Sequence, residues 1–310
     1  MENLPQKPKL FMIAGPTAVG KTSISVRLAK EFDAEIISAD SMQIYRGMNV
    51  GTGKITEVEK NGIPHHLIDI IDVNESYSVG QFVEDAEKAI GQLQQRKKNI
   101  LVAGGTGLYL NALIHGYNFA DIGQSETIRE HYLHLAETKG NLYLWQKLKQ
   151  HDPESAEKIS INDVKRLIRA LEILEVTGEP KSKRATKLPE SKYDILLIIL
   201  NCDRMELYEK INCRVDDMLK NGLMEEARKF TEFRDAQSMQ AIGYKEFVDY
   251  FDGKTNYTET IEAIKKHSRN YAKRQMTFFR WIKTKEKLLV DTSDYSAVCD
   301  AARRFWNTIK

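Results

Sequence analysis

Short apolar runs of strand type alternate with helical patterns through the first third of the chain. The runs cover residues 10–14, 34–38, 67–71 and 99–103, and helical spacing covers residues 21–31 and about 80–95. Ile24, Leu28 and Phe32 fall on one face of the first helix. Strands separated by helices predict an α/β fold in which a parallel sheet is flanked by helices.

Residues 119–185 have a different character, because strand runs disappear and the helical period dominates. Asn162 or Asp163 can cap a helix whose inner face presents Leu167 and Leu171, and Gly178 ends it. We therefore predict a core domain and an all-helical insertion domain. Their expected bounds are residues 1–118 with 186–310 for the core, and 119–185 for the insertion.

The sheet pattern returns at residues 195–200, an apolar run that we expect to form a buried strand, and Asp203 follows it. An aspartate after an apolar strand resembles a second nucleotide-binding motif, in which the carboxylate holds Mg²⁺. Asp203 can instead cap the helix expected at 204–220, and we favour capping. Asn221 and Gly222 would close that helix.

A long helix is expected from Thr258, its predicted N-cap, to about Lys287. Its second half is strongly basic, with Glu286 as the only acid between Lys265 and Lys287. The basic residues are Lys265, Lys266, Arg269, Lys273, Arg274, Arg280, Lys283, Lys285 and Lys287. Interleaved aromatics include Tyr271 and Trp281. This combination suits phosphate backbone and unpaired bases. A solvated helix with its aromatics in the core is the alternative, but the charge asymmetry favours nucleic acid.

Composition bears on whether the protein is soluble, associates with a membrane or holds a structural metal. The chain has 310 residues and a formal net charge of +2, with 42% hydrophobic and 29% charged residues, as expected of a soluble globular protein. Its longest apolar run, residues 195–200, is too short to span a bilayer, and the N-terminus has no apolar signal core. None of the three cysteines lies in a zinc-binding spacing. We therefore expect a cytoplasmic protein with no membrane association and no structural metal.

Residues 15–22 fit the phosphate-loop pattern G-x-x-x-x-G-K-[ST] between an apolar strand and a helix. Amides at the start of the helix would face an anion, and the helix dipole favours its negative charge. Lys21 would reach phosphate oxygens, and the Thr22 hydroxyl would hold Mg²⁺. The residues expected to bind a di- or triphosphate are Gly15, Pro16, Thr17, Ala18, Val19, Gly20, Lys21 and Thr22. An ordinary glycine turn is the alternative, but strand, loop and helix in this order favour a P-loop NTPase-like fold.

Two further groups are expected at the same edge of the sheet. Asp40 follows the strand at 34–38, and ligands bind at the carboxyl ends of parallel strands. Its carboxylate could ligate Mg²⁺ indirectly, act as a general base, or only cap a turn, and spacing does not separate these roles. Gly104-Gly105-Thr106-Gly107 follows the strand at 99–103 and places Thr106 in the same crevice.

These residues leave two main classes of function open. One is a kinase or nucleotide hydrolase. The other is an enzyme that uses the phosphate loop to hold a diphosphate leaving group while it modifies a nucleic acid. A nucleotide-dependent binding switch is a weaker third reading. Residue types alone do not separate these classes.

A set of motifs in a fixed order does separate them, because together they resemble the bacterial tRNA dimethylallyltransferase (tRNA isopentenyltransferase) family over most of the chain. The motifs are Gly15 to Thr22; Ser38-Ala39-Asp40-Ser41 with Tyr45-Arg46-Gly47-Met48; Pro64-His65-His66-Leu67-Ile68-Asp69; Gly104-Gly105-Thr106-Gly107-Leu108-Tyr109; Asn162-Asp163 with Arg166, Arg169, Ala170, Leu171 and Glu172; Ile242-Gly243-Tyr244; and Lys273-Arg274-Gln275 with Arg280-Trp281. Many families share the phosphate loop, but the combination is specific.

The resemblance implies transfer of a dimethylallyl group from dimethylallyl diphosphate to the exocyclic N6 amine of the adenosine 3′ to the anticodon, in tRNAs reading codons that begin with U. It implies that the phosphate loop binds the prenyl diphosphate without ATP, with Mg²⁺ on Thr22. By the same resemblance Asp40 is the general base, Thr106 lines the channel where the substrates meet, and Arg214 stabilises the leaving diphosphate. The adenosine would be flipped out of the anticodon loop.

The resemblance also implies a tRNA-binding surface and an insertion that clamps the anticodon stem. The implied residues are Asp40, Ser41, Met42, Gln43, Lys165, Arg166, Leu167, Ile168, Arg169, Gln240, Ala241, Ile242, Gly243, Tyr244, Lys245, Lys273, Arg274, Gln275 and Arg280. We expect a monomer, without the zinc finger that eukaryotic members often have at their C-terminus. A relative that prenylates free adenine nucleotides is the nearest alternative, but it needs neither the basic helix nor the insertion. A P-loop kinase acting on a small molecule is the other.

Overall fold

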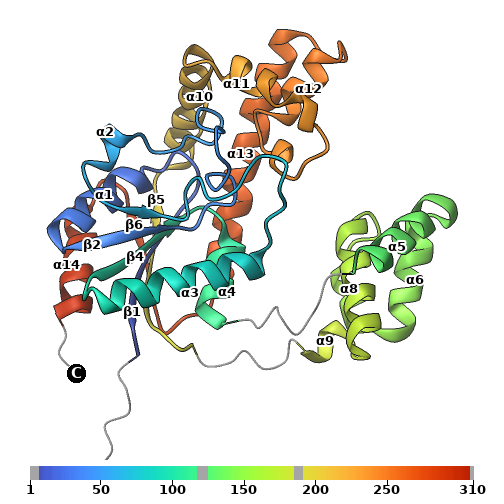
Figure 1. Ribbon diagram of the computed structural model, residues 1–310, viewed down its shortest axis with the longest axis horizontal. Coiled ribbons are helices and arrows are strands. Elements are labelled where there is room, and N and C mark those ends of the chain that lie inside the picture. The colour runs from blue at the N-terminus through green and yellow to red at the C-terminus, as the bar shows by residue number, and fades with distance from the viewer. Residues whose placement is uncertain (1–6, 117–124, 185–190, 308–310) are drawn as a thin grey trace, which may run out of the picture. The chain divides into compact units, whose positions relative to one another are not determined.

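The computed structural model describes residues 7–116, 125–184 and 191–307 (Figure 1). By the contacts between its residues, the chain divides into two compact units. The core unit comprises residues 1–114 and 191–310, and the helical unit comprises residues 115–190. Strands from both segments of the core unit join one sheet, so the helical unit is inserted within the sequence of the core unit.

A six-stranded sheet forms the centre of the core unit, in the order β3-β2-β4-β1-β5-β6. Its strands are β1 (Lys9–Ala14), β2 (Ala34–Ser38), β3 (His65–His66), β4 (Asn99–Gly104), β5 (Asp194–Asn201) and β6 (Glu286–Asp291). Met12 of β1 lies opposite Val102 of β4 and Leu197 of β5. Every pair in this sheet is parallel, so the segments that follow the strands leave from one edge. The predicted α/β class is confirmed.

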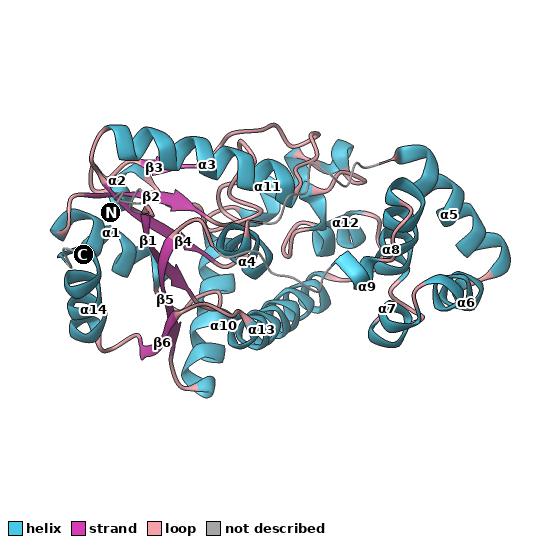
Figure 2. Cartoon of the chain, turned by 90° about the horizontal axis from the view of Figure 1, so that it is seen from below, coloured by secondary structure: helices cyan, strands magenta, loops and turns pink. Residues whose placement is uncertain are grey.

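Helices flank this sheet (Figure 2). The core unit contains α1 (Lys21–Glu31), α2 (Glu57–Lys60), α3 (Val79–Gln95), α4 (Gly107–His115), α10 (Arg204–Lys220), α11 (Leu223–Lys229), α12 (Lys245–Phe251), α13 (Tyr257–Trp281) and α14 (Tyr295–Asn307), with short 3-10 helices at Thr231–Phe233 and Ser238–Gln240. α10 and α13 pack against each other. None of the described helices is long and apolar enough to cross a lipid bilayer.

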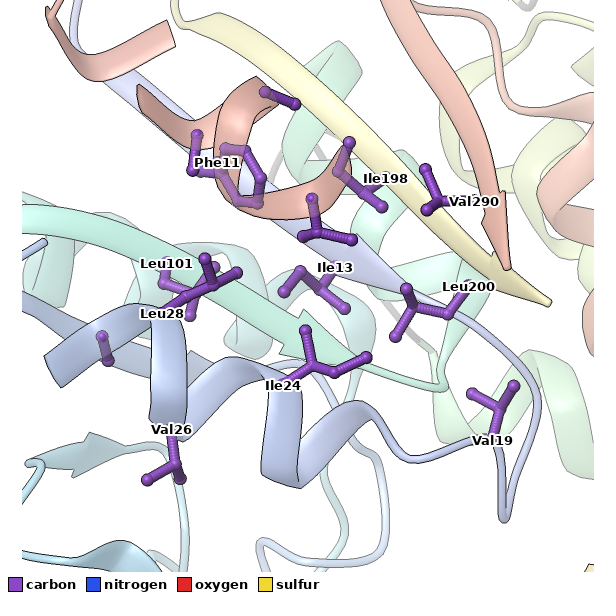
Figure 3. Packing of buried hydrophobic residues seen from close by; sticks show 14 of the residues in the cluster. Phe11, Ile13, Val19, Ile24, Val26, Leu28, Leu101, Ile198, Leu200 and Val290 are labelled. Atoms are coloured by element: carbon purple, nitrogen blue, oxygen red, sulfur yellow. The ribbon is translucent and has the colours of Figure 1, made fainter. Parts of the chain in front are cut away.

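The central strands β1, β2, β4 and β5 are buried on both faces, which explains their nearly continuous apolar sequences. Phe11 and Ile13 of β1 point into a cluster formed with residues of α1, α14 and β5 (Figure 3). Leu10 and Met12, the alternate residues of β1, are fully buried outside that cluster, on the opposite face. The core therefore extends through the sheet and fixes the edge from which the loops emerge.

Two helix predictions are confirmed at both ends, those of α1 and α10. Asp203 is the N-cap of α10, where its Oδ1 accepts hydrogen bonds from the amides of Met205 (2.7 Å) and Glu206 (3.2 Å). The C-cap of the same helix is Asn221. The prediction that Asp203 caps this helix is therefore confirmed.

The prediction of a strand at residues 67–71 is wrong. The strand lies two residues earlier, at His65–His66, and pairs with β2. Leu67 and Asp69 have left-handed backbone angles, with φ of 62° and 56°, which end the extended conformation although the sequence is apolar. His66 Nε2 lies 2.8 Å from a carboxylate oxygen of Glu35 in β2, so this histidine has a structural role.

The long helix predicted from Thr258 to Lys287 differs from the structure at both ends. α13 begins after Asn256, which forms a capping box, and it ends at Trp281. Residues 286–291 instead form β6, the edge strand beside β5. Lys287, expected on the helix, donates from its Nζ to two carbonyls at the end of α13, at 3.0 and 2.8 Å. A side chain that follows the helix thus pairs with its last carbonyls.

The described part of the helical unit is formed by α5 (Glu126–Lys139), α6 (Asn141–His151), α7 (Pro153–Lys158), α8 (Val164–Thr177) and α9 (Lys181–Arg184). Its core includes Leu148, Leu167 and Leu171. Asp163 caps α8, and Gly178 ends it in a left-handed conformation with φ of 71°. Both predicted ends of α8 are confirmed.

Ile198→Ala should destabilise the core unit by about 3 kcal/mol, because this fully buried side chain in β5 leaves a cavity when truncated. Leu289→Ala is the control. Leu289 lies on the neighbouring strand with 59% of its surface exposed, so its truncation should cost about 0.5 kcal/mol or less. Urea unfolding followed by circular dichroism measures both. Equal losses would contradict the assignment of β6 as an exposed edge strand.

Candidate active site

The phosphate loop lies between β1 and α1. Gly20, with φ of 91°, precedes the first turn of α1, and Val19 is buried in the core. Lys21 folds back over the loop, and its Nζ donates to the carbonyls of Gly15 (2.9 Å) and Pro16 (2.7 Å). The loop therefore has its shape before an anion binds, with a cation at its centre.

Lys21 is poorly solvated. Burial lowers the pKa of its ammonium to about 8; the Asp40 carboxylate acts against this shift, and the Arg214 guanidinium adds to it. A bound phosphate would supply negative charge that this environment lacks. The loop therefore favours an anion with several charged oxygens.

Arg214 reaches the same place from α10. Burial lowers the pKa of its guanidinium, while the charges of Asp40 and Glu59 act in the opposite direction. Its Nη2 lies 3.5 Å from the carbonyl of Thr52, in the loop that follows β2. Lys21, Asp40 and Arg214, which belong to separate stretches of sequence, therefore lie close enough to interact electrostatically.

Hydrogen bonds join the two loops that contain Asp40 and Thr106. Thr106 Oγ1 accepts from the amide of Ser41 (2.9 Å), and the Thr106 amide donates to the carbonyl of Ala39 (3.1 Å). Asp40 Oδ1 accepts from the amide of Met42 (2.9 Å) and closes a turn. Among the described residues, no hydrogen bond engages the other carboxylate oxygen. The turn-capping role and the role of a base are therefore compatible.

Tyr271 of α13 completes the surroundings of Asp40. Burial raises the pKa of its phenol to about 12, with the charge of Asp40 as the second cause, whereas hydrogen bonds from Thr106 and Gln275 act in the opposite direction. In the sequence, Tyr271 stands out only as one aromatic of a basic helix. Its four-residue spacing from Gln275 is the signal that places both side chains on one helical face.

Gln275 joins α13 to the two loops. Its Oε1 accepts from the amide of Thr17 (2.9 Å), and its Nε2 donates to the carbonyl of Gly105 (2.9 Å). The residue is only 5% exposed. Gln275, expected at the tRNA surface, therefore holds the phosphate loop from within the protein.

The other residues expected to contact tRNA differ in exposure. Gln240, Lys245, Lys165, Arg166, Lys273, Arg274 and Arg280 are exposed. Ser41, Met42, Gln43, Arg169 and Ile242 are half-buried. Leu167, Ile168, Ala241, Gly243 and Tyr244 are buried. Direct contact with tRNA through the side chains of Leu167, Ile168, Ala241 and Tyr244 does not fit the structure, because these side chains are buried.

A buried carboxylate organises part of α8. Burial acts to raise the pKa of Glu172, but hydrogen bonds from Arg169, from the Ser125 amide and from Arg129 lower it below its usual range. Arg169 Nη1 lies 2.6 Å from the carboxylate. Arg169 is therefore held inside the helical unit, and Arg166 in the first turn of α8 is the more exposed guanidinium.

Two open cavities flank the outside of the phosphate loop, with volumes of about 630 and 590 Å³. Thr22 and Arg27 line the first, and Asp203 and Asp291 line the second. Neither is lined by Asp40 or by Thr106. Asp40 and Thr106 therefore lie outside both cavities.

The site combines a phosphate loop with a half-buried lysine, a carboxylate near it and a helix with exposed basic residues. An α/β enzyme with a phosphorylated substrate would need such an arrangement. Residues 43–281 match the family model described as IPP transferase. The chain belongs to this family of prenyl-transferring enzymes, and the resemblance seen in its motifs is confirmed.

Relatives are similar along nearly their whole length. The tRNA dimethylallyltransferase of Caldanaerobacter subterraneus subsp. tengcongensis is 47% identical over 279 residues, which cover 88% of this chain and 89% of that protein. The protein of the same name from Shouchella clausii is 49% identical over 276 residues, which cover 89% of each.

Solved structures agree with this relationship. The full-length tRNA isopentenylpyrophosphate transferase of Bacillus halodurans has a TM-score of 0.72 and 43% identity, with 96% of this chain and 97% of that chain covered. A eukaryotic dimethylallyltransferase acting on tRNA has a TM-score of 0.79 and 31% identity, with 93% of this chain and 75% of that chain covered.

Binding of inorganic pyrophosphate should be accompanied by proton uptake near pH 8. Lys21 is partly deprotonated there, because its pKa is about 8, and a bound anion favours the charged form. The affinity that Lys21 contributes is full below this pH and is lost as the pH rises above it. Titration calorimetry in buffers of different ionisation enthalpy measures the uptake. Lys21→Arg corrects for protons of the anion itself, since a guanidinium stays charged. Equal uptake by both proteins would contradict the assignment.

Proposed function

We propose that the protein transfers a dimethylallyl group from dimethylallyl diphosphate to the N6 amine of the adenosine on the 3′ side of the anticodon, in tRNAs reading codons that begin with U. A bond forms between N6 and the primary allylic carbon while the bond from that carbon to the diphosphate oxygen breaks. Diphosphate leaves with the electron pair, and N6 loses one proton. The observation that supports this most is 47% and 49% identity, along nearly the whole chain, to relatives named tRNA dimethylallyltransferase.

Charge on the leaving diphosphate is the first demand of this reaction. We infer that the amides of the phosphate loop, the Lys21 ammonium and the Arg214 guanidinium bind that charge. Burial keeps both cations poorly solvated before substrate binds. Donors already in place in a site of low polarity stabilise developing charge more than the same donors do in water.

Mg²⁺ fits this site as an ion held mainly by the diphosphate. The ion prefers oxygen ligands, keeps several waters, and is often bound by one or two protein groups together with substrate phosphates. Thr22 offers one exposed hydroxyl at the start of α1. The described residues contain no cluster of three His, Cys, Asp or Glu side chains that could hold a metal by themselves. Thr22 would hold the ion, which when bound neutralises part of the diphosphate charge.

Asp40 is proposed to accept the proton from N6. The adenine amine is a weak nucleophile, so loss of its proton must accompany bond formation. The Met42 amide fixes one oxygen of Asp40, and Tyr271 lies within electrostatic reach of the carboxylate. Thr106, bonded to the amide next to Asp40, is proposed to line the channel in which amine and allylic carbon meet.

The tRNA is proposed to contact the exposed side of α13. Lys273, Arg274 and Arg280 are exposed there, and cations of this kind suit phosphate oxygens. Trp281 at the end of α13 is 79% exposed, and a free aromatic ring suits stacking on an unpaired base. The helical unit is proposed to clamp the anticodon stem. A stacked adenosine cannot reach Asp40, so the base is flipped out.

One chain supplies every group used in this mechanism, so we propose that the protein acts as a monomer, in the cytoplasm with its tRNA. Asp203, the carboxylate that a small-molecule kinase would use for Mg²⁺, caps α10. A free adenine nucleotide would leave the exposed cations of α13 without use. Neither alternative is favoured.

Asp40→Asn should lower the rate of prenyl transfer by about 100-fold or more, because an amide cannot accept the proton. The dissociation constant for tRNA should change little, since Asp40 is only one of many residues proposed to contact the tRNA. Single-turnover transfer from labelled dimethylallyl diphosphate and filter binding of tRNA measure the two quantities. Asp235→Asn, at an exposed position, is the control. Equal losses of rate and affinity in Asp40→Asn would contradict the role of base.

Arg274→Ala should weaken tRNA binding and reduce the slope of log K against log salt by about one unit, as expected when one phosphate contact is lost. Filter binding at a series of KCl concentrations measures the slope. Lys30→Ala removes an exposed cation near the end of α1 and should leave the slope unchanged. If Arg274→Ala also leaves it unchanged, Arg274 does not contact a phosphate.

A further inference from the structure

Outside the groups used above, one buried carboxylate holds the loop that follows β2. Glu226 lies in α11 and is only 8% exposed. Its Oε2 accepts from the amides of Asn49 and Val50, both at 2.9 Å. Its Oε1 accepts from the amide of Gly51 (3.0 Å) and from the hydroxyl of Tyr244 (2.5 Å). A single side chain thus organises three consecutive amides that lie about 175 residues earlier in the chain.

The negative charge makes this arrangement hard to replace. Successive amides that converge on one point form a concave site for an anion, and hydrogen bonds to an ionised acceptor are stronger than bonds between neutral groups. A glutamine at position 226 has one oxygen that accepts and one NH₂ group that only donates. Glu226→Gln therefore keeps the volume, loses acceptor sites and turns a donor toward other donors.

The same loop lies against Arg214 with no spare room. A side-chain carbon at Gly53 would lie 1.9 Å from Arg214 Nη2, and one at Gly51 would lie 2.4 Å from the Tyr244 ring. The carbonyl of Thr52 lies 3.5 Å from the same guanidinium nitrogen. The loop is therefore held between the ring that bonds the buried carboxylate and the guanidinium that faces the phosphate loop.

We propose that Glu226 is a positioning residue for the diphosphate site: through residues 49–53 it sets the place of the Arg214 guanidinium. The inference rests on the role proposed above for Arg214. Arg214 comes from α10 and Glu226 from α11, two helices that contact each other (Figure 1). A side chain of α11 therefore holds the loop against which the guanidinium from α10 lies. Without the carboxylate, Arg214 remains in the chain but loses the surface that places it.

A double-mutant cycle tests this, with inorganic pyrophosphate as the probe and the full chain as the protein. Glu226→Gln should weaken pyrophosphate binding about tenfold when Arg214 is present, as expected for lost hydrogen bonds to a charged group. In Arg214→Ala the same substitution should weaken binding less than about twofold, because no guanidinium is left to position. Titration calorimetry up to millimolar pyrophosphate measures each dissociation constant.

Glu225→Gln is the matched control, since Glu225 is the exposed neighbour in the same turn of α11, and it should bind pyrophosphate as the native protein does. Equal losses from Glu226→Gln with and without Arg214, or no loss at all, would overturn the proposal. A purely structural role would weaken binding in both backgrounds. Circular dichroism shows whether Glu226→Gln folds. If it does not fold, Tyr244→Phe takes its place in the cycle, because it removes one of the four hydrogen bonds to Glu226. A smaller loss of pyrophosphate affinity is then expected, and again only when Arg214 is present.

Pyrophosphate binding needs neither tRNA nor prenyl transfer, so the two proposals fail separately. A native protein that binds pyrophosphate and transfers no prenyl group would contradict the proposed function, while the cycle would still decide whether Glu226 acts through Arg214. A native protein that transfers the prenyl group, with losses that add in the cycle, would overturn only the role of Glu226.

Discussion

The arrangement of the site depends most on one buried amide, that of Gln275. It accepts from Thr17 in the phosphate loop, 258 positions away, and donates to Gly105 in the second loop, 170 positions away. An amide side chain offers both an acceptor and a donor, and here each loop takes one of them. This bridge fixes the rotation of α13 about its axis. Tyr271 and Gln275 consequently face the two loops, while Arg274 is exposed. The same helix can therefore present a basic surface and support the phosphate loop.

Around this bridge, the protein gathers charges where water solvates them poorly. Burial lowers the pKa of Lys21 and of Arg214, and the charge of Asp40 opposes both shifts. A diphosphate bound here would bring negative charge to both cations, which burial leaves poorly solvated. The buried Glu226 belongs to the same arrangement, because its charge holds the loop against which Arg214 lies.

Much of the fold could be predicted from local sequence, because strand runs, the Asp203 cap and the Gly178 helix end depend on neighbouring residues. β6 could not, since an exposed edge strand lacks a continuous apolar run and is defined by its partner β5. The residues of the site likewise fall into those that local sequence reveals and those that it does not. The phosphate loop, Asp40 and Thr106 follow strands and are visible in the sequence. The roles of Tyr271, Gln275 and Glu226 arise from contacts between residues far apart in the chain, which no local pattern encodes.

We propose that this phosphate loop binds a prenyl diphosphate and that an adenosine in tRNA receives the prenyl group. The most direct measurement incubates the protein with unmodified tRNA and dimethylallyl diphosphate in the absence of ATP, and analyses the digested nucleosides by mass spectrometry. We expect a dimethylallyl mass increment on the adenosine 3′ to the anticodon, with release of diphosphate. Prenylation of free adenine nucleotides instead of tRNA, or turnover of ATP with no prenyl transfer, would contradict this function.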